Sequence, residues 1–126
     1  MAGEHLVSIV VPCRNEAAFI DAFCADALRQ ALAPPWQLEL IIADGHSDDG
    51  TRERLQALAA AEPRLRVVGN PARFVAAGLN RALAAAGGAV IVRMDVHTRY
   101  APDYVAQCLA ALRRSGADNV GGPWRA

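Results

Sequence analysis

Four short apolar segments, each rich in β-branched residues, are spaced along this chain with longer, more polar intervals between them. The segments span residues 6–11, 38–43, 65–68 and 89–94. Their length and composition predict β-strands. Since a segment long enough to hold a helix separates each pair of strands, the strands are expected to be connected by helices and to run parallel.

The intervals between the strands carry apolar side chains at the three- and four-residue spacing that predicts helices. We expect four helices, the last beginning after Pro102 and ending at Gly116. Strands joined in this way need helices on both faces of the sheet. The sequence therefore predicts an α/β fold with a doubly wound, mainly parallel sheet. The expected helices lie within residues 19–27, 51–60, 77–83 and 104–112.

Length and composition limit the function classes. The 126 residues suffice for one compact domain, which we expect to fill residues 1–126. Hydrophobic residues make up 53% of the chain, but no apolar run approaches the roughly 18 residues of a membrane-spanning helix. Thirteen basic residues balance thirteen acidic ones, so no net field attracts nucleic acid or an anionic membrane. The amino terminus lacks the pattern of a signal peptide, and we expect a cytoplasmic protein.

The three cysteines, Cys13, Cys24 and Cys108, are far apart, and none belongs to a CxxC pair. Small apolar packing is the expected role of all three. Cys13 is also a candidate for the wall of a pocket because it follows the first strand.

Polar residues gather where three of the predicted strands end, in segments 12–16, 44–51 and 95–97. In doubly wound sheets, ligands bind beyond the carboxyl ends of the strands, where the strand order reverses. Each loop alone could be an ordinary solvated loop, but three on one edge favour a binding site. In the first of them, main-chain N–H groups are expected to face the ligand.

The familiar motifs of several enzyme classes are missing. The chain contains no GxGxxG after its first strand, no GxxxxGK[ST] and no GxSxG, which argues against dinucleotide-dependent dehydrogenases, P-loop enzymes and serine hydrolases. Asp95 and His97 remain, separated by one residue just past a strand. A carboxylate and an imidazole so placed can bind one divalent ion, Mn²⁺ or Mg²⁺, or connect it to a diphosphate. The spacing alone is common by chance.

Three stretches, VSIVVPCRNE, IIADGHSDDGT and GLNRALAAAGGAVIVRMDVHTRY, together carry a resemblance that covers nearly the whole chain. In this order they resemble the amino-terminal half of family 2 glycosyltransferases, which are inverting enzymes with an A-type nucleotide-sugar-binding fold. The chain is most similar to polysaccharide-synthesising members of the succinoglycan type, in which the D-x-D motif is commonly D-x-H. The resemblance implies a Rossmann-like half of that fold, a hexosyltransferase activity and a uridine- or guanosine-diphosphate sugar as donor. It also implies a glycan or lipid-linked acceptor for the complete enzyme.

The resemblance also implies site residues. Asp95 would lie near the ribose and diphosphate, and His97 would replace the usual second aspartate, so that both are metal ligands. The turn of residues 12–16 and Asp44 would frame the base. No catalytic residue is assigned. The implied nucleotide-binding residues are Pro12, Cys13, Arg14, Asn15, Glu16, Asp44, Asn80 and Asp95.

The chain departs from the family pattern at several positions. Gly45 stands where many members have a second aspartate, which leaves open whether Asp44 reads the base. Asp49 matches a later family acid, although capping of the following helix is at least an equal interpretation. The family's A-R-N-x-G helix start corresponds here to residues 78–82 without its arginine, and either Arg81 or Arg73 is the candidate replacement.

The acceptor half of the resembled enzymes follows the D-x-D strand and brings a carboxylate that acts as general base. Residues 120–126 hold no such acidic pair, and Asp103 and Asp118 fit a helix start and a turn. We therefore expect a truncated chain that binds a nucleotide sugar and does not transfer it. The alternative is a non-catalytic nucleotide-binding or partner-binding module on the same scaffold.

Overall fold

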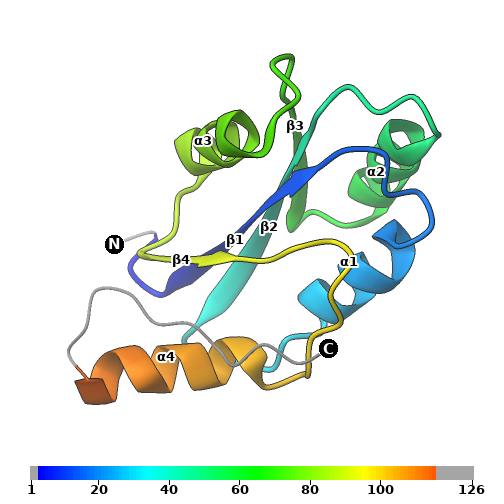
Figure 1. Cartoon of the computed structure of the whole chain (residues 1–126). Helices are drawn as coiled ribbons and strands as arrows, with labels where there is room; N and C mark the ends of the chain where they lie inside the picture. The colour runs from blue at the N-terminus through cyan, green and yellow to red at the C-terminus, as the bar shows by residue number, and fades with distance from the viewer. Residues whose placement is uncertain (1–2, 116–126) are drawn as a thin grey trace.

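The computed structural model describes residues 3–115, in which four strands alternate with four helices (Figure 1). This confirms the predicted α/β class. The expected helix end at Gly116, Asp118 and segment 120–126 lie outside the described residues. No helix within the described part is both long and apolar enough to cross a membrane. The elements are β1 (Leu6–Cys13), α1 (Ile20–Leu28), β2 (Gln37–Asp44), α2 (Thr51–Ala61), β3 (Leu65–Gly69), α3 (Val75–Ala85), β4 (Val90–Arg93) and α4 (Tyr104–Ser115).

All four strands of the sheet run parallel, in the order β3-β2-β1-β4. The chain moves from β1 outward to β2 and β3, and then returns to the other side of β1 to form β4. The strand order therefore reverses between β1 and β4, and in parallel sheets this reversal opens a crevice at the carboxyl ends of the two strands.

Helices cover both faces of the sheet, as predicted (Figure 1). On one face, Ile9 of β1 and Leu40 of β2 join Phe23 of α1 in a core to which α2 and α4 also contribute. On the other face, Val10 and Ile41 pack against α3. Successive strand residues point to opposite faces, so two cores need apolar side chains at nearly every position of β1 and β2.

Ser8 is an exception to this apolar pattern, because it is fully buried within β1. Its hydroxyl donates to Glu39 Oε2 at 2.5 Å and accepts from the backbone N–H of Gly88 at 2.9 Å. The N–H of Gly87 also donates to Glu39 Oε2, at 2.8 Å. This network ties the connection before β4 to the two central strands and satisfies the buried polar groups.

Gly88 leaves no room for a side chain. A Cβ at this position would lie 2.6 Å from both Leu6 O and Ser8 Oγ. We expect Gly88→Ala to lower the free energy of unfolding by roughly 1–3 kcal/mol, as overpacking does in other cores. Gly69→Ala is the control, because a Cβ at Gly69 would meet nothing within 4 Å, and its effect should stay within about 0.5 kcal/mol. Urea denaturation measures both, and equal stability of the two variants would contradict this account.

Candidate functional site

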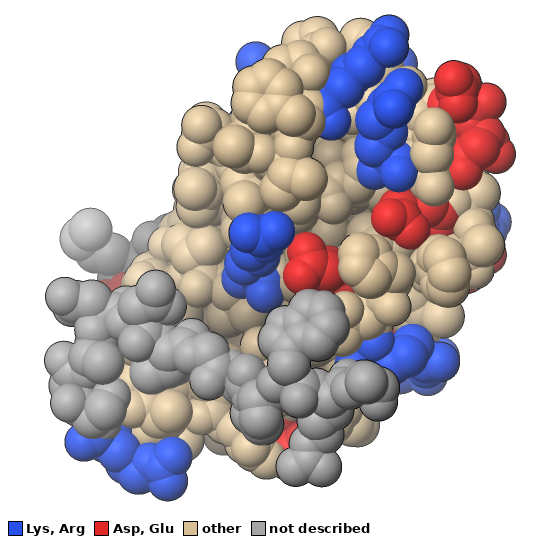
Figure 2. Space-filling model, viewed as in Figure 1, with Lys and Arg blue, Asp and Glu red and all other residues tan. Residues whose placement is uncertain are grey.

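A pocket of about 170 Å³ lies at the carboxyl ends of β1 and β4, where the strand order reverses. The loop between β3 and α3 forms its third wall. Figure 2 shows basic side chains beside acidic ones on this part of the surface. The pocket is lined by Pro12, Cys13, Arg14, Glu16, Asn70, Arg73, Phe74, Val75, Arg93, Asp95, Val96 and His97.

Six of the predicted site residues line this pocket, and three do not. Asn15 takes part in a contact between loops, where its side chain accepts from the N–H of Asp48 at 2.9 Å. Asp44 is only 2% exposed and accepts from the hydroxyl of Ser47 at 2.6 Å. Asn80 lies on the exposed side of α3. The six that the pocket brings together are Pro12, Cys13, Arg14, Glu16, Asp95 and His97.

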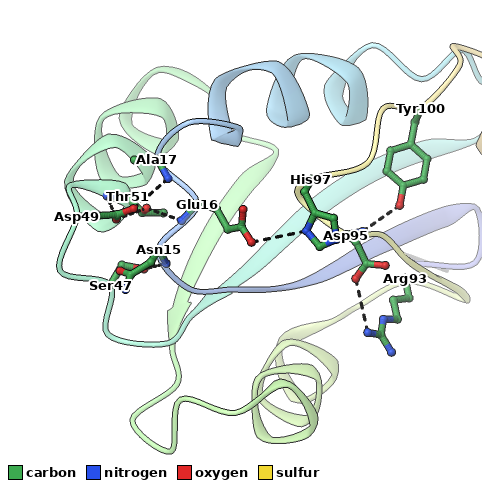
Figure 3. Close-up of polar contacts among 10 residues, drawn as sticks. All are labelled: Asn15, Glu16, Ala17, Ser47, Asp49, Thr51, Arg93, Asp95, His97 and Tyr100. Atoms are coloured by element: carbon green, nitrogen blue, oxygen red, sulfur yellow. Dashed lines mark hydrogen bonds and ion pairs between the residues drawn. The ribbon is translucent and has the colours of Figure 1, made fainter. Parts of the chain in front are cut away.

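The turn after β1 is held by segment 47–51, which precedes α2 (Figure 3). Three consecutive backbone amides of this turn donate to side chains of that segment. The pairs are Asn15 N to Ser47 Oγ at 2.9 Å, Glu16 N to Thr51 Oγ1 at 3.0 Å and Ala17 N to Asp49 Oδ2 at 3.2 Å. The expectation that main-chain amides of segment 12–16 face the ligand is therefore wrong for Asn15 and Glu16, because protein acceptors already engage these amides.

Asp49 directly precedes Gly50, the N-cap residue of α2, and supports the start of that helix, in line with the structural one of its two interpretations. Its carboxylate accepts from the N–H of Thr51 at 3.0 Å and from the hydroxyl of the same residue at 2.5 Å. The hydroxyl hydrogen bond of Thr51 is the main reason why the pKa of Asp49 is lowered. Asp49 does not line the pocket. It ties the first turn of α2 to the turn after β1.

The alternation of Asp95 and His97 with buried neighbours explains the D-x-H spacing. Met94 is fully buried and Val96 nearly so, and both belong to the core beneath the pocket. Asp95 and His97, which alternate with them, are exposed enough to present their polar side chains to the pocket, while Val96 contributes to its wall. The side chain of Asp95 is 36% exposed and that of His97 is 59% exposed, so a ligand can approach both.

Each of these two side chains faces an oppositely charged or polar partner (Figure 3). Asp95 Oδ1 lies 3.5 Å from Nη2 of Arg93, the last residue of β4. His97 Nδ1 lies 3.6 Å from Glu16 Oε1, which belongs to the turn after β1. The second contact crosses the crevice and brings residues 81 positions apart in the sequence into one site.

The pocket also holds three arginines, Arg14, Arg73 and Arg93. Arg14 donates through Nε to the carbonyl of Gly45 at 2.9 Å, so its guanidinium is held against the loop after β2. Of the two arginines considered as replacements for the family's arginine, Arg73 lines the pocket. The other, Arg81, donates to the carbonyl of Gly69 at 3.0 Å on an exposed surface. Three guanidinium groups can offset the charge of a diphosphate.

Sequence reasoning missed the wall that follows β3, which includes Asn70, Phe74 and Val75. Asn70 is 2% exposed and donates through Nδ2 to the carbonyl of Phe74 at 3.0 Å. Its Oδ1 is buried and accepts no hydrogen bond from residues 3–115. The signal was present, because Asn70 follows directly after β3 and the strand-end rule applies there as well.

Cys13 lies in the pocket wall but is not suited to nucleophilic catalysis. Burial, together with the nearby carboxylates of Asp44 and Glu16, raises the pKa of its thiol to about 12. The thiolate is the reactive form of cysteine, and almost none is present near neutral pH.

We predict that Cys13 in the folded protein resists alkylation by iodoacetamide at pH 8. Burial also raises the pKa of Cys24 to about 12, so both thiols should react far more slowly than in urea-unfolded protein, where the pKa is near 8.5. Mass spectrometry of the alkylated peptides over time provides the measurement. Equal rates for Cys13 in folded and unfolded protein would contradict its assignment as a packing residue.

Asp95 and His97 both line the pocket, and a carboxylate and an imidazole are side chains of types that can bind a divalent ion. Within residues 3–115 no group of three or more His, Cys, Asp or Glu side chains could hold a metal ion. Two protein ligands leave most coordination positions of Mn²⁺ or Mg²⁺ for diphosphate oxygens and water, which is the usual arrangement for ions bound with phosphates. The imidazole is better tolerated by Mn²⁺ than by Mg²⁺.

The sequence model described as Glycosyl transferase family 2 matches residues 8–126 of the chain. Over 126 residues the chain is 40% identical to the succinoglycan biosynthesis protein ExoA of Rhizobium meliloti (strain 1021). That match covers 95% of this chain and 38% of ExoA. Over 104 residues the chain is 34% identical to the chondroitin synthase of Pasteurella multocida (strain Pm70), which covers 82% of this chain and 10% of the synthase.

Solved structures share the fold. The mannosyltransferase PcManGT from Pyrobaculum calidifontis, in complex with GDP-Man and Mn²⁺, superposes with a TM-score of 0.76 at 30% identity. The superposition covers 84% of this chain and 32% of the mannosyltransferase. S. aureus TarS 1–349 in complex with UDP gives a TM-score of 0.72 at 17% identity, over 94% of this chain and 38% of TarS. The chain thus spans between a tenth and two fifths of the length of these proteins.

Proposed function

Since the chain belongs to glycosyl transferase family 2, we propose that it forms the nucleotide-sugar-binding part of an inverting glycosyltransferase of polysaccharide synthesis. The observation that carries this proposal is the joint placement of Asp95, His97 and three arginines around one pocket at the reversal of strand order. The donor we propose is a uridine- or guanosine-diphosphate sugar, and the acceptor a glycan or a lipid-linked glycan. The nucleotides in PcManGT and in TarS support this donor class.

The charged residues of the pocket have separate roles in this proposal. Asp95 and His97 would hold Mn²⁺ or Mg²⁺ together with a bound diphosphate, and the Mn²⁺ in PcManGT supports a divalent ion. The ion supplies electrostatic stabilisation of the charge that develops on the departing nucleotide. Arg14, Arg73 and Arg93 bind phosphate oxygens, since guanidinium groups form paired hydrogen bonds with phosphate. The wall of Pro12 and Cys13 packs against the nucleoside.

We predict that nucleotide affinity depends on the metal. In calorimetric titrations with uridine or guanosine diphosphate, Mn²⁺ should strengthen binding by about tenfold, or ~1.4 kcal/mol. Asp95→Ala should abolish this gain because the variant loses the carboxylate that contacts both ion and ribose. His97→Ala should reduce it by a smaller factor, because Asp95 and the diphosphate still hold the ion.

Glu53→Ala is the matched control, because this exposed acid of α2 lies outside the pocket. Its loss should leave nucleotide affinity unchanged, both with and without Mn²⁺. Equal binding with and without Mn²⁺ in the unmodified chain would refute the metal site. If His97→Ala loses more of the Mn²⁺-dependent gain in affinity than Asp95→Ala does, the two assigned roles are reversed.

We also predict that the 126-residue chain by itself does not transfer sugar to an acceptor. Transfer requires a base within hydrogen-bond reach of the acceptor hydroxyl, and loss of that base alone typically costs 10²- to 10⁴-fold in rate. Slow hydrolysis of the donor should remain. A nucleotide-release assay with uridine- and guanosine-diphosphate sugars, run with and without glycan acceptors, tests this. Turnover that rises with acceptor would mean that a catalytic carboxylate lies within residues 1–126.

A further inference from the structure

The backbone of Asp95 is held by a tyrosine five residues further along the chain (Figure 3). The N–H of Asp95 donates to the hydroxyl oxygen of Tyr100 at 2.9 Å. The carbonyl of Asp95 accepts from the N–H of Thr98 at 3.2 Å, which closes a turn. Both polar backbone groups of Asp95 are therefore engaged within the loop that follows β4.

The ring of Tyr100 is fixed between two helices. Its centroid lies 6.2 Å from that of Phe23 on α1 and 5.0 Å from that of Tyr104 on α4, and both pairs meet edge to face. Edge-to-face contacts are favourable arrangements for aromatic rings. Burial raises the pKa of the Tyr100 hydroxyl further above its ordinary value, which already leaves a tyrosine neutral near pH 7. The hydroxyl is thus presented at a defined place beneath Asp95.

The backbone of Tyr100 is fixed as well, by Asp26 of α1. The carboxylate of Asp26 accepts from the N–H of Tyr100 at 3.1 Å and from Arg99 at 2.7 and 3.1 Å. Its side chain is only 11% exposed. The hydrogen bond from Arg99 is the main cause that lowers the pKa of Asp26, so the carboxylate is ionised. Charged hydrogen bonds of this kind are stronger than neutral ones.

We propose that Tyr100 is a positioning residue for Asp95, and that Asp26 holds Tyr100 in place for this purpose. The hydrogen bond fixes the backbone from which the Asp95 carboxylate reaches the pocket, 3.5 Å from Arg93 and ready to exchange that partner for an ion. This inference rests on the proposed function of Asp95 as a metal ligand. Groups that orient metal ligands typically contribute 10- to 100-fold to metal affinity.

The test is Tyr100→Phe, which removes the hydroxyl and keeps the ring. The quantity to measure is the ratio of the nucleotide diphosphate Kd without Mn²⁺ to the Kd with Mn²⁺, determined by calorimetry on the full 126-residue chain. We expect this ratio to fall at least threefold in the variant, while the Kd without metal stays within about twofold. Tyr104→Phe removes a hydroxyl from the same aromatic group and should keep the ratio of the unmodified chain.

Amide hydrogen exchange, followed by NMR without metal or nucleotide, tests the hydrogen bond itself. The Asp95 amide should exchange faster in Tyr100→Phe and in Asp26→Ala than in the unmodified chain, and Tyr104→Phe should leave it protected. The positioning role is overturned if the ratio in Tyr100→Phe stays as high as in the unmodified chain, or if the variant loses nucleotide affinity equally with and without Mn²⁺. Neither result would affect the metal-binding proposal. A ratio of one in the unmodified chain would overturn the metal-binding proposal and this inference with it.

Discussion

Pairing of β1 on both of its edges is the constraint from which the pocket follows. β1 pairs with β2 over eight residues and with β4 over four, all in parallel. Since β3 lies on the far edge of β2, the chain must cross the sheet to reach β4, and α3 makes this crossing on the face opposite α1 and α2. The loops after β1 and β4 lead to α1 and α4 on one face, the loop after β3 leads to α3 on the other, and the pocket lies among these three loops.

Most of the fold could be predicted from local pattern, because short β-branched runs and helical spacing report directly on burial. The prediction ended the first strand at Val11, whereas β1 continues through Pro12 to Cys13. The carbonyl of Val10 accepts from Met94 on the β4 side, and that of Cys13 accepts from Gly45 on the β2 side. The backbone groups of successive strand residues point alternately to the two neighbouring strands, so those of Pro12 point to the β4 side. Pro12 lies beyond Val10, the last residue of β1 that pairs with β4, so the N–H that proline lacks removes no hydrogen bond between these strands.

The site could be predicted only in part. Asp95 and His97 follow from the strand-end rule, and the structure brings both to one pocket. Asn80 was assigned to the site through a motif. Gly78 and Ala82 form the buried side of α3. Asn80 is two positions from each of them and therefore lies on the opposite side of the helix. The contact between Glu16 and His97 joins distant parts of the chain, and single-sequence patterns carry no information about such pairs.

Asp95 and His97 already have polar partners before any ligand arrives, with Arg93 beside Asp95 and Glu16 beside His97. A cation that takes Asp95 leaves the guanidinium of Arg93 without its partner, and a phosphate group is the natural replacement. A phosphate that takes Arg93 likewise leaves the carboxylate available to a cation. Each species would thus lower the cost of binding the other, and thermodynamic linkage makes this mutual gain equal in both directions. We therefore expect the pocket to favour a cation and a diphosphate as a pair over either one alone.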